Sequence, residues 1–194
     1  VSDLFLPGPP ALMSNELTFI LSRLVPAAFI FAFGACMGSL INVLVYRLPR
    51  GLSVVTPPSA CPSCGTTLTW RENIPIFGWL LLRGKCRFCK SPISPEYPLV
   101  EAFTAVLVTG FFVLYWYVDA PAVWLGVDWA RIRPDWMTPH LPGLIWPTFA
   151  MLVLLLGSLV AMTLVDAKTF TIPLVLPWFI AVLGVVAHTA HATY

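Results

Sequence analysis

Four long stretches with almost no charged residues constrain the fold of this chain more than any other feature. They cover residues 24–46, 98–118, 141–165 and 169–187. About 20 consecutive apolar residues cross a hydrocarbon layer roughly 30 Å thick, so each stretch is long enough for one crossing. Lipid offers the backbone no hydrogen-bond partners, which favours helices, and the alternating pattern of a membrane β-strand is absent. The sequence predicts an all-α integral membrane protein with about four transmembrane helices.

Composition supports the same class of protein. Hydrophobic residues make up 58% of the chain and charged residues 10%, with a mean hydropathy of +0.85. Soluble domains are instead about half apolar and a quarter charged. The net charge is only +2 and no basic patch is present, so nucleic acid is not an expected partner. The expected partner of the apolar surface is the lipid bilayer.

The basic residues indicate how the helices are oriented. Segment 47–97 contains seven of the eleven Lys and Arg residues, and basic residues are retained on the cytoplasmic side of a membrane. We therefore expect 47–97 to form a cytoplasmic loop domain and 166–168 a cytoplasmic turn. Residues 1–23 are then an external tail, and 119–140 an external loop.

Two Cys-x-x-Cys pairs lie in the cytoplasmic loop, Cys61 with Cys64 and Cys86 with Cys89, with 21 residues between the pairs. This pattern is typical of a tetrahedral zinc site, and four protein ligands leave no position for a reactive water, so the zinc is expected to be structural. Two disulfides or four unrelated thiols are the alternatives, which a reducing cytoplasm disfavours. Cys36, alone in the first stretch, is interpreted as a small buried apolar residue.

Motifs before, between and after the two cysteine pairs occur in the same order in one known family. The first stretch ends in GSLINV at 38–43 and YRLP at 46–49; the loop then reads NIP at 73–75, GWLLLRG at 78–84 and PISPEYPLVE at 92–101. Together with the cysteine pairs, these motifs resemble the N-terminal part of the bacterial type IV prepilin peptidases, bifunctional leader peptidases and N-methyltransferases. The likeness covers about Gly34 to Phe103.

The resemblance implies an enzyme of the bacterial inner membrane. Such an enzyme cleaves the leader of type IV prepilins or pseudopilins at the cytoplasmic face and methylates the new N-terminus with S-adenosylmethionine. Its substrates serve type IV pili or type II secretion. No glycine-rich nucleotide-binding fingerprint follows a strand here, so only the resemblance suggests that methyl donor.

The resemblance also implies candidate residues for methylation or substrate binding: Gly38, Ser39, Asn42, Arg47 and Glu101. Each has a structural alternative. Gly38 and Ser39 are small enough to allow close helix packing, Asn42 could bond between helices, and Arg47 could anchor the helix at the headgroups. Glu101 needs a partner at the start of a span, and Arg47 is a candidate for that role.

Asp166 is the candidate peptidase residue. Ile172 and Pro173 follow it in the family's arrangement, although Leu174 stands where the family often has Asp or Asn. A carboxylate at a membrane boundary is a functional candidate by default. The resemblance makes Asp166 the first of two aspartates, one protonated and one ionised, that activate water and protonate the leaving amide. The alternative is that Asp166 only ends a helix beside Lys168.

The second aspartate of the family lies in a GxGD motif, and no Gly-Asp pair follows Asp166 in this sequence. We therefore expect a truncated or split enzyme, whose peptidase activity needs another chain to supply the GxGD half. Two alternatives remain open: a methyltransferase without peptidase activity, and a non-enzymatic, zinc-stabilised membrane docking module.

Overall fold

The computed structural model describes residues 11–117, 123–124, 127–128 and 142–192. Its elements are α1 (Ala11–Arg47), the 3₁₀ turn η1 (Leu48–Arg50), α2 (Phe77–Leu81), α3 (Glu96–Trp116), β1 (Val123–Trp124), β2 (Val127–Asp128), α5 (Pro142–Thr169) and α6 (Val175–Ala192). The two strands form one antiparallel pair, in which Val123 is opposite Asp128. The rest of the described fold is helical or loop, which confirms the predicted class.

Three described helices are long and apolar enough to cross a membrane. They cover Glu16–Arg50, Glu96–Trp116 and Phe149–Thr169. In α6 the described apolar part, Val175–Val186, is shorter. The fourth predicted crossing therefore stays a prediction, while the other three stretches coincide with helices of sufficient length.

Two helix ends differ from the predicted boundaries. Helix α1 begins at Ala11, inside the segment expected to be a tail, because residues 11–23 are rich in good helix formers. Helix α5 continues through the predicted turn at 166–168 and ends at Thr169. The chain turns at Phe170, whose φ of 51° is left-handed and cannot continue a helix. The predictions for residues 1–10 and for most of 119–140 lie outside the described residues.

Helix α1 lies between α3 and α5, and its contact with α3 is very close. A Cβ atom added at Gly34 would lie 2.8 Å from Cα of Ala105, and one at Gly38 would lie 2.5 Å from Cα of Glu101. Glycines four residues apart let two helix backbones approach in this way. At the end of the bundle where α3 ends, Val108, Phe112, Tyr115, Phe149 and Val153 form a buried cluster.

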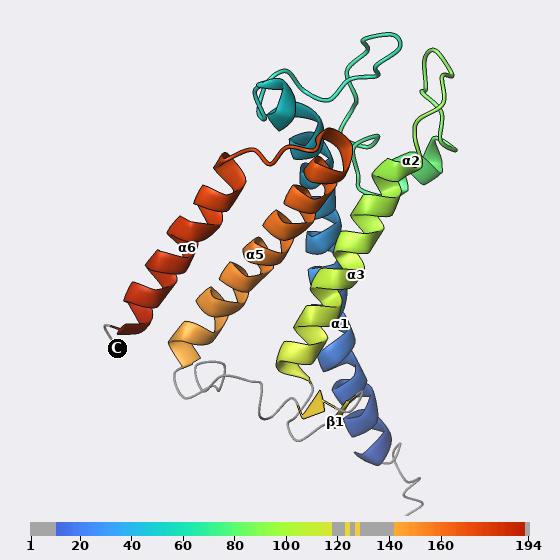
Figure 1. Cartoon of the computed structure of the whole chain (residues 1–194). Coiled ribbons are helices and arrows are strands. Elements are labelled where there is room, and N and C mark those ends of the chain that lie inside the picture. The colour runs from blue at the N-terminus through green and yellow to red at the C-terminus, as the bar shows by residue number, and fades with distance from the viewer. Residues whose placement is uncertain (1–10, 118–122, 125–126, 129–141, 193–194) are drawn as a thin grey trace, which may run out of the picture.

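The cysteine-containing loop, residues 51–95, lies at the end of the bundle where α1 ends and α3 begins (Figure 1). At this end a second buried cluster joins α1, α5 and α6 through Ile41, Val45, Ala161, Val165 and Leu176. The turn between α5 and α6 lies at the same end in Figure 1, and α6 runs back alongside α5. The loop and the α5–α6 turn are thereby brought to one end of the helices.

Candidate functional site

The two Cys-x-x-Cys pairs fold into matching turns. In the first, the Gly65 N–H donates to the Cys61 carbonyl at 2.9 Å; in the second, the Lys90 N–H donates to the Cys86 carbonyl at 3.1 Å. Gly65 and Lys90 both have positive φ, 71° and 60°. Each pair is flanked by an isolated antiparallel bridge, Ala60 with Thr67 and Lys85 with Pro92. The turns are thus equivalent structures, 25 residues apart along the chain.

The four sulfur atoms of these turns meet at one point, within 4.8 Å of one another. Sγ of Cys61 lies 3.7 Å from Sγ of Cys89, and Sγ of Cys64 lies 4.0 Å from Sγ of Cys86. Both distances are far beyond a disulfide bond. Four thiolates bound to zinc at about 2.3 Å lie about 3.8 Å apart in a tetrahedron. The cluster therefore has the size and donor set of a metal site.

Hydrogen bonds favour the thiolate form of two of these cysteines, Cys61 and Cys89. The pKa of Cys86 is instead raised, because burial and the neighbouring thiols of Cys61 and Cys89 outweigh its backbone hydrogen bonds. The backbone N–H groups of Cys64 and Ser63, and then the Ser91 hydroxyl, lower the pKa of Cys61 to about 6. The pKa of Cys89 is lowered chiefly by the Ser91 side chain, whose Oγ lies 3.1 Å from its sulfur. Metal binding requires thiolate rather than thiol. Cys61 and Cys89 are therefore the ligands whose surroundings favour the charge state that a metal needs.

Two side chains tie the loop together around the cluster. Glu72 accepts hydrogen bonds from the N–H and hydroxyl of Thr69 and pairs with Nε of Arg87 at 3.0 Å. These Thr69 bonds, with a smaller contribution from Arg87, lower the pKa of Glu72. Trp79 donates its indole N–H to the Ile93 carbonyl at 3.0 Å. The second cysteine turn is thereby attached to both the first turn's flank and α2.

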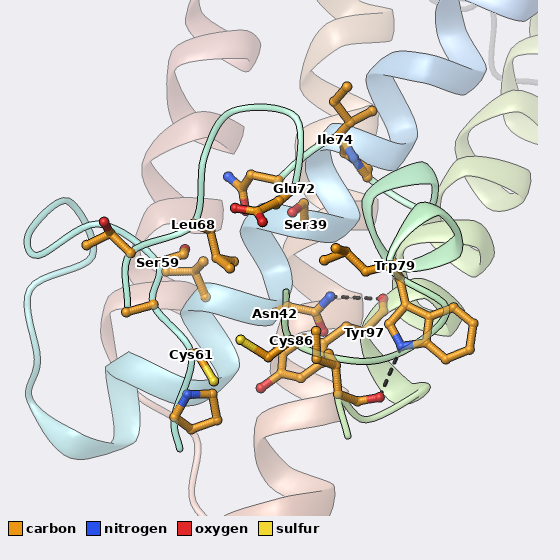
Figure 2. Close-up of a pocket in the computed structure, with 18 of the residues that line it drawn as sticks. Ser39, Asn42, Ser59, Cys61, Leu68, Glu72, Ile74, Trp79, Cys86 and Tyr97 are labelled. Atoms are coloured by element: carbon orange, nitrogen blue, oxygen red, sulfur yellow. Dashed lines mark hydrogen bonds between the residues drawn. The ribbon is translucent and has the colours of Figure 1, made fainter. Parts of the chain in front are cut away.

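A cavity of about 670 Å³ lies between this loop and the ends of α1 and α3. Its volume is typical of sites for small organic molecules. Figure 2 shows Ser39 and Asn42 of α1 on one side, with Cys61 and Cys86 of the loop nearby. Four of the five methylation candidates line this cavity, namely Ser39, Asn42, Arg47 and Glu101. Residues far apart in the sequence are thus brought together at one place.

Glu101 is the most enclosed polar group of the cavity, with only 8% of its surface exposed. Its Oε2 accepts a hydrogen bond from the Ile76 N–H at 2.6 Å, and the Ser39 side chain also donates to the carboxylate. Ile76 has a φ of +64°, and the Phe77 N–H reaches back to the Pro75 carbonyl at 2.6 Å, so the chain forms a tight γ-turn. Such turns are strained. The strained turn points the Ile76 N–H at the Glu101 carboxylate.

The remaining α1 candidates have clear structural roles at the cavity. Gly38 is buried where α1 meets Glu101 of α3. Asn42 donates its amide to the Tyr97 carbonyl at 3.1 Å and so joins α1 to the first turn of α3 (Figure 2). Close packing at Gly38 is what places Ser39 within hydrogen-bond reach of Glu101.

Arg47 organises the loop and does not contact Glu101 in the described structure. Its guanidinium donates to the carbonyls of Ser53, Val54 and Pro57 at 2.9, 3.2 and 2.6 Å. Three carbonyls satisfy most of the donors on one face of the side chain. Arg47 therefore does not pair with Glu101 as expected. It instead stabilises the turn at residues 53–57, which leads toward the first cysteine pair.

Asp166 is exposed on the last turn of α5 and is not among the residues that line the cavity. It nevertheless lies at the same end of the bundle, because Lys168, two residues later, pairs with Glu96 at the start of α3 at 2.6 Å. The structure thus brings the methylation candidates together and leaves the peptidase candidate on a neighbouring, open surface.

Sequence reasoning missed two features of the site. Ile76 was not singled out, although the adjacent Asn73-Ile74-Pro75 motif was the available signal. Cys36 was interpreted as buried, which is wrong: it is exposed and lines the cavity. It faces away from the glycine side of α1 that packs on α3, and a single sequence does not say which face of an apolar helix is covered.

Fold and site together define the class: a helical membrane protein with a four-cysteine, metal-type domain set against the paired ends of two apolar helices. The bacterial peptidase A24 N-terminal domain matches residues 32–117, which include the cavity and all four cysteines. Prepilin leader peptidase/N-methyltransferases from Klebsiella pneumoniae and Pseudomonas aeruginosa are 37% and 34% identical, over 75% and 91% of this chain. The chain belongs to the type IV prepilin peptidase family.

The likeness has a defined extent. The chain spans 54% of the Klebsiella pneumoniae protein and 57% of the Pseudomonas aeruginosa protein. A Myxococcus xanthus relative with the same name is 52% identical over 42% of this chain, and the match covers 24% of that protein. No solved structure is significantly similar to the chain.

Proposed function

We propose that this chain carries the methyl-transfer site of a prepilin leader peptidase/N-methyltransferase and one of the two carboxylates of its peptidase site. The observation that carries the proposal is the convergence of Ser39, Asn42, Arg47 and Glu101 on one cavity. These residues come from motifs that the family resemblance singles out. If these residues had only a structural role, no cavity would be required at the place where they meet.

The cysteine cluster is proposed to hold a structural zinc ion. Its four thiolates leave no open coordination position, and the sulfur–sulfur distances of 3.7 and 4.0 Å fit a tetrahedron. Cys61 and Cys86 also line the cavity. The ion would therefore shape one wall of the cavity without taking part in a reaction.

The residues of the cavity suit methylation of a peptide N-terminus. When bound, S-adenosylmethionine supplies an electrophilic methyl group. The cavity is large enough for a small organic molecule and opens beside the loop. The α1–α3 contact holds Ser39 and Asn42 in place. Arg47 holds the loop from residue 53 to 57, and these contacts together fix the walls of the cavity. Rigid walls orient reactants, which is a large part of catalysis.

Methyl transfer by the purified chain tests the proposal. The chain in detergent micelles is mixed with a synthetic peptide that begins at a mature pilin N-terminus and with methyl-labelled S-adenosylmethionine. We expect label in the peptide above that of a heat-inactivated sample. Ser39→Ala with Asn42→Ala should lower incorporation about tenfold or more, because several oriented contacts are lost. Incorporation equal to the heat-inactivated sample would contradict the proposal.

The peptidase half of the proposal depends on Asp166. The Lys168–Glu96 pair at 2.6 Å places this part of α5 beside the start of α3, at the end of the bundle where the cavity lies. A leader peptide bound there would have its cleavage site and its new N-terminus close together. The paired-carboxylate reaction needs a second aspartate, and no Gly-Asp pair follows Asp166 in this sequence.

Co-expression tests this part. The chain is produced together with the C-terminal half of the Klebsiella pneumoniae relative, and processing of a prepilin is followed by gel shift. We expect cleavage with the wild-type chain and none with Asp166→Asn. Asp128→Asn, which changes an aspartate of the β1–β2 hairpin, is the matched control. Equal cleavage by the Asp166 variant would show that Asp166 is not a catalytic residue.

A further inference from the structure

Glu101 lacks a positive partner in the described structure, although cations are nearby. Two of them, Arg47 and Arg87, line the same cavity. Arg47 donates to three loop carbonyls, and Arg87 pairs with Glu72. Lys168, at the same end of the bundle, pairs with Glu96. The only described donors to Glu101 are neutral: the Ile76 N–H and the Ser39 side chain.

A buried carboxylate without a countercharge is costly, because burial removes the water that would otherwise stabilise it. Glu101 is 8% exposed, yet the surrounding chain adopts a strained γ-turn at Ile76 that donates to its carboxylate. A structural role alone would be met by Gln, which carries no charge. The arrangement therefore suits a ligand that brings its own positive charge into the cavity.

The other walls of the cavity are compatible with an organic cation. Trp79 and Tyr97 line it together with Glu101. The aromatic face attracts alkylammonium and sulfonium groups, which are less strongly hydrated than metal ions. The Trp79 ring is fixed by its indole N–H bond to the Ile93 carbonyl, and the backbone of Tyr97 is held by the bond that its carbonyl accepts from Asn42. The cavity thus combines one buried carboxyl group with the aromatic side chains of Trp79 and Tyr97.

We propose that Glu101 binds the positively charged amino terminus of a peptide substrate and accepts its proton, which makes the amine nucleophilic. This inference rests on the proposed methyl transfer. The ammonium gives one proton to the carboxylate. The lone pair of the resulting amine forms the new N–CH₃ bond, while the S–CH₃ bond of the sulfonium donor breaks and leaves its electron pair on sulfur. The carboxylic acid then returns the proton to water. Glu101 is thereby assigned as a catalytic residue.

Two peptides that differ in one charge test the assignment. The first begins with a free amino terminus of the mature pilin segment, and the second is the same peptide with an acetylated terminus. Binding to the full chain in micelles is measured by calorimetry for the wild type, for Glu101→Gln and for Glu96→Gln. Glu96 is the matched control because it lies on the same helix, is exposed and is not among the cavity residues.

We expect the wild type to bind the free peptide roughly thirtyfold more tightly than the acetylated one, since a buried charge pair is lost on acetylation. Glu96→Gln should keep that preference and Glu101→Gln should lose it. Zinc content and helical circular dichroism verify that each variant is folded. If Glu101→Gln does not fold, Glu101→Asp, which keeps the charge, is compared with the wild type and should retain part of the preference.

Three results would overturn the inference. Equal binding of both peptides by the wild type, together with methylation of the free one, rejects the role of Glu101 and leaves the proposed methyl transfer intact. Loss of S-adenosylmethionine binding in Glu101→Gln, with the peptide preference unchanged, assigns the carboxylate to the sulfonium instead. Absence of binding for either peptide rejects the proposed function and the inference together.

Discussion

The two cysteine turns show how one backbone requirement is met by different residues. Gly65 and Lys90 occupy the same position, with φ of 71° and 60°. Left-handed backbone costs a non-glycine residue about 1 kcal/mol or more, whereas glycine adopts it freely. The second turn therefore carries a conformational cost that the first does not.

Replacing Lys90 by glycine is expected to stabilise the loop. Relief of the left-handed strain, less the greater freedom of glycine in the unfolded chain, leaves a gain of about 0.5–1 kcal/mol. Resistance of the loop to limited proteolysis at rising urea concentration measures the change. Lys85→Gly removes the same charge and is the control. Lys85 lies in the bridge to Pro92 and has no positive φ, so glycine there should destabilise the loop.

Gly38 is the residue on which the α1–α3 contact depends most directly. An added methyl group would lie 2.5 Å from Cα of Glu101, which is backbone that cannot move aside cheaply. Gly38→Ala is therefore expected to destabilise the bundle by about 1–3 kcal/mol, as overpacking of a tight contact does. Thermal unfolding in detergent measures the loss, and methyl transfer should fall with it.

The matched control for Gly38 is Gly110→Ala on α3. A Cβ atom added at Gly110 has no neighbour within 4 Å, and alanine is the better helix former, so its effect should be small or stabilising. Similar destabilisation by the two substitutions would show that the close α1–α3 approach is not what holds this end of the bundle.

Among the elements, the loop of residues 51–95 is the one that we expect to depend on a bound ion. Few of its residues are buried, and these are Cys61, Gly78, Gly84 and Cys86. So little apolar surface is covered that ordinary packing contributes little to its order. Helices α1, α3 and α5 instead cover one another through two buried clusters. Loop and helices should respond differently to loss of the metal.

Removing zinc with a chelator is expected to unfold the loop and leave the helices intact. Proteolysis should cut the loop rapidly, while helical circular dichroism changes little. Protons compete with zinc for thiolates, and hydrogen bonds lower the pKa of Cys61 from 9.0 to about 6. Because bound zinc competes with protons for the thiolates, it should be kept at neutral pH and released only in acid, as a metal-sensitive dye reports. Full zinc retention at about pH 4, or no change in proteolysis without zinc, would contradict this account.

For the whole molecule, the end of the bundle that holds the cavity, the cysteine loop and Asp166 should face the cytoplasm. Seven of the eleven basic residues lie between Arg47, at the end of α1, and Lys90 in this loop, and basic segments are retained inside. Alkaline phosphatase, which is active only outside, should therefore be inactive when fused after Leu52 and active when fused after Tyr117. The reverse pattern would place the cavity outside and separate it from a cytoplasmic methyl donor.

Sequence alone determined much of this protein, because apolar length and cysteine spacing are local properties. The runs that predicted the first three spans coincide with α1, α3 and α5. The two Cys-x-x-Cys pairs predicted a cluster that the structure brings within 4.8 Å. Local motifs were also sufficient for the family, since the match to residues 32–117 covers the same segment that the motifs indicated.

Only the tertiary structure decided how these parts form a site. Ser39 and Glu101 are 62 positions apart along the chain and meet because Gly38 lets α1 lie against α3. Ile76 reaches Glu101 through a strained turn, Arg47 binds the loop in place of Glu101, and Cys36 faces the cavity. Contacts of this kind depend on which faces of uniformly apolar helices pack together, and composition and spacing do not specify those faces. The burial of the Glu101 carboxyl group without a cationic partner among the described residues is therefore visible only in the folded chain.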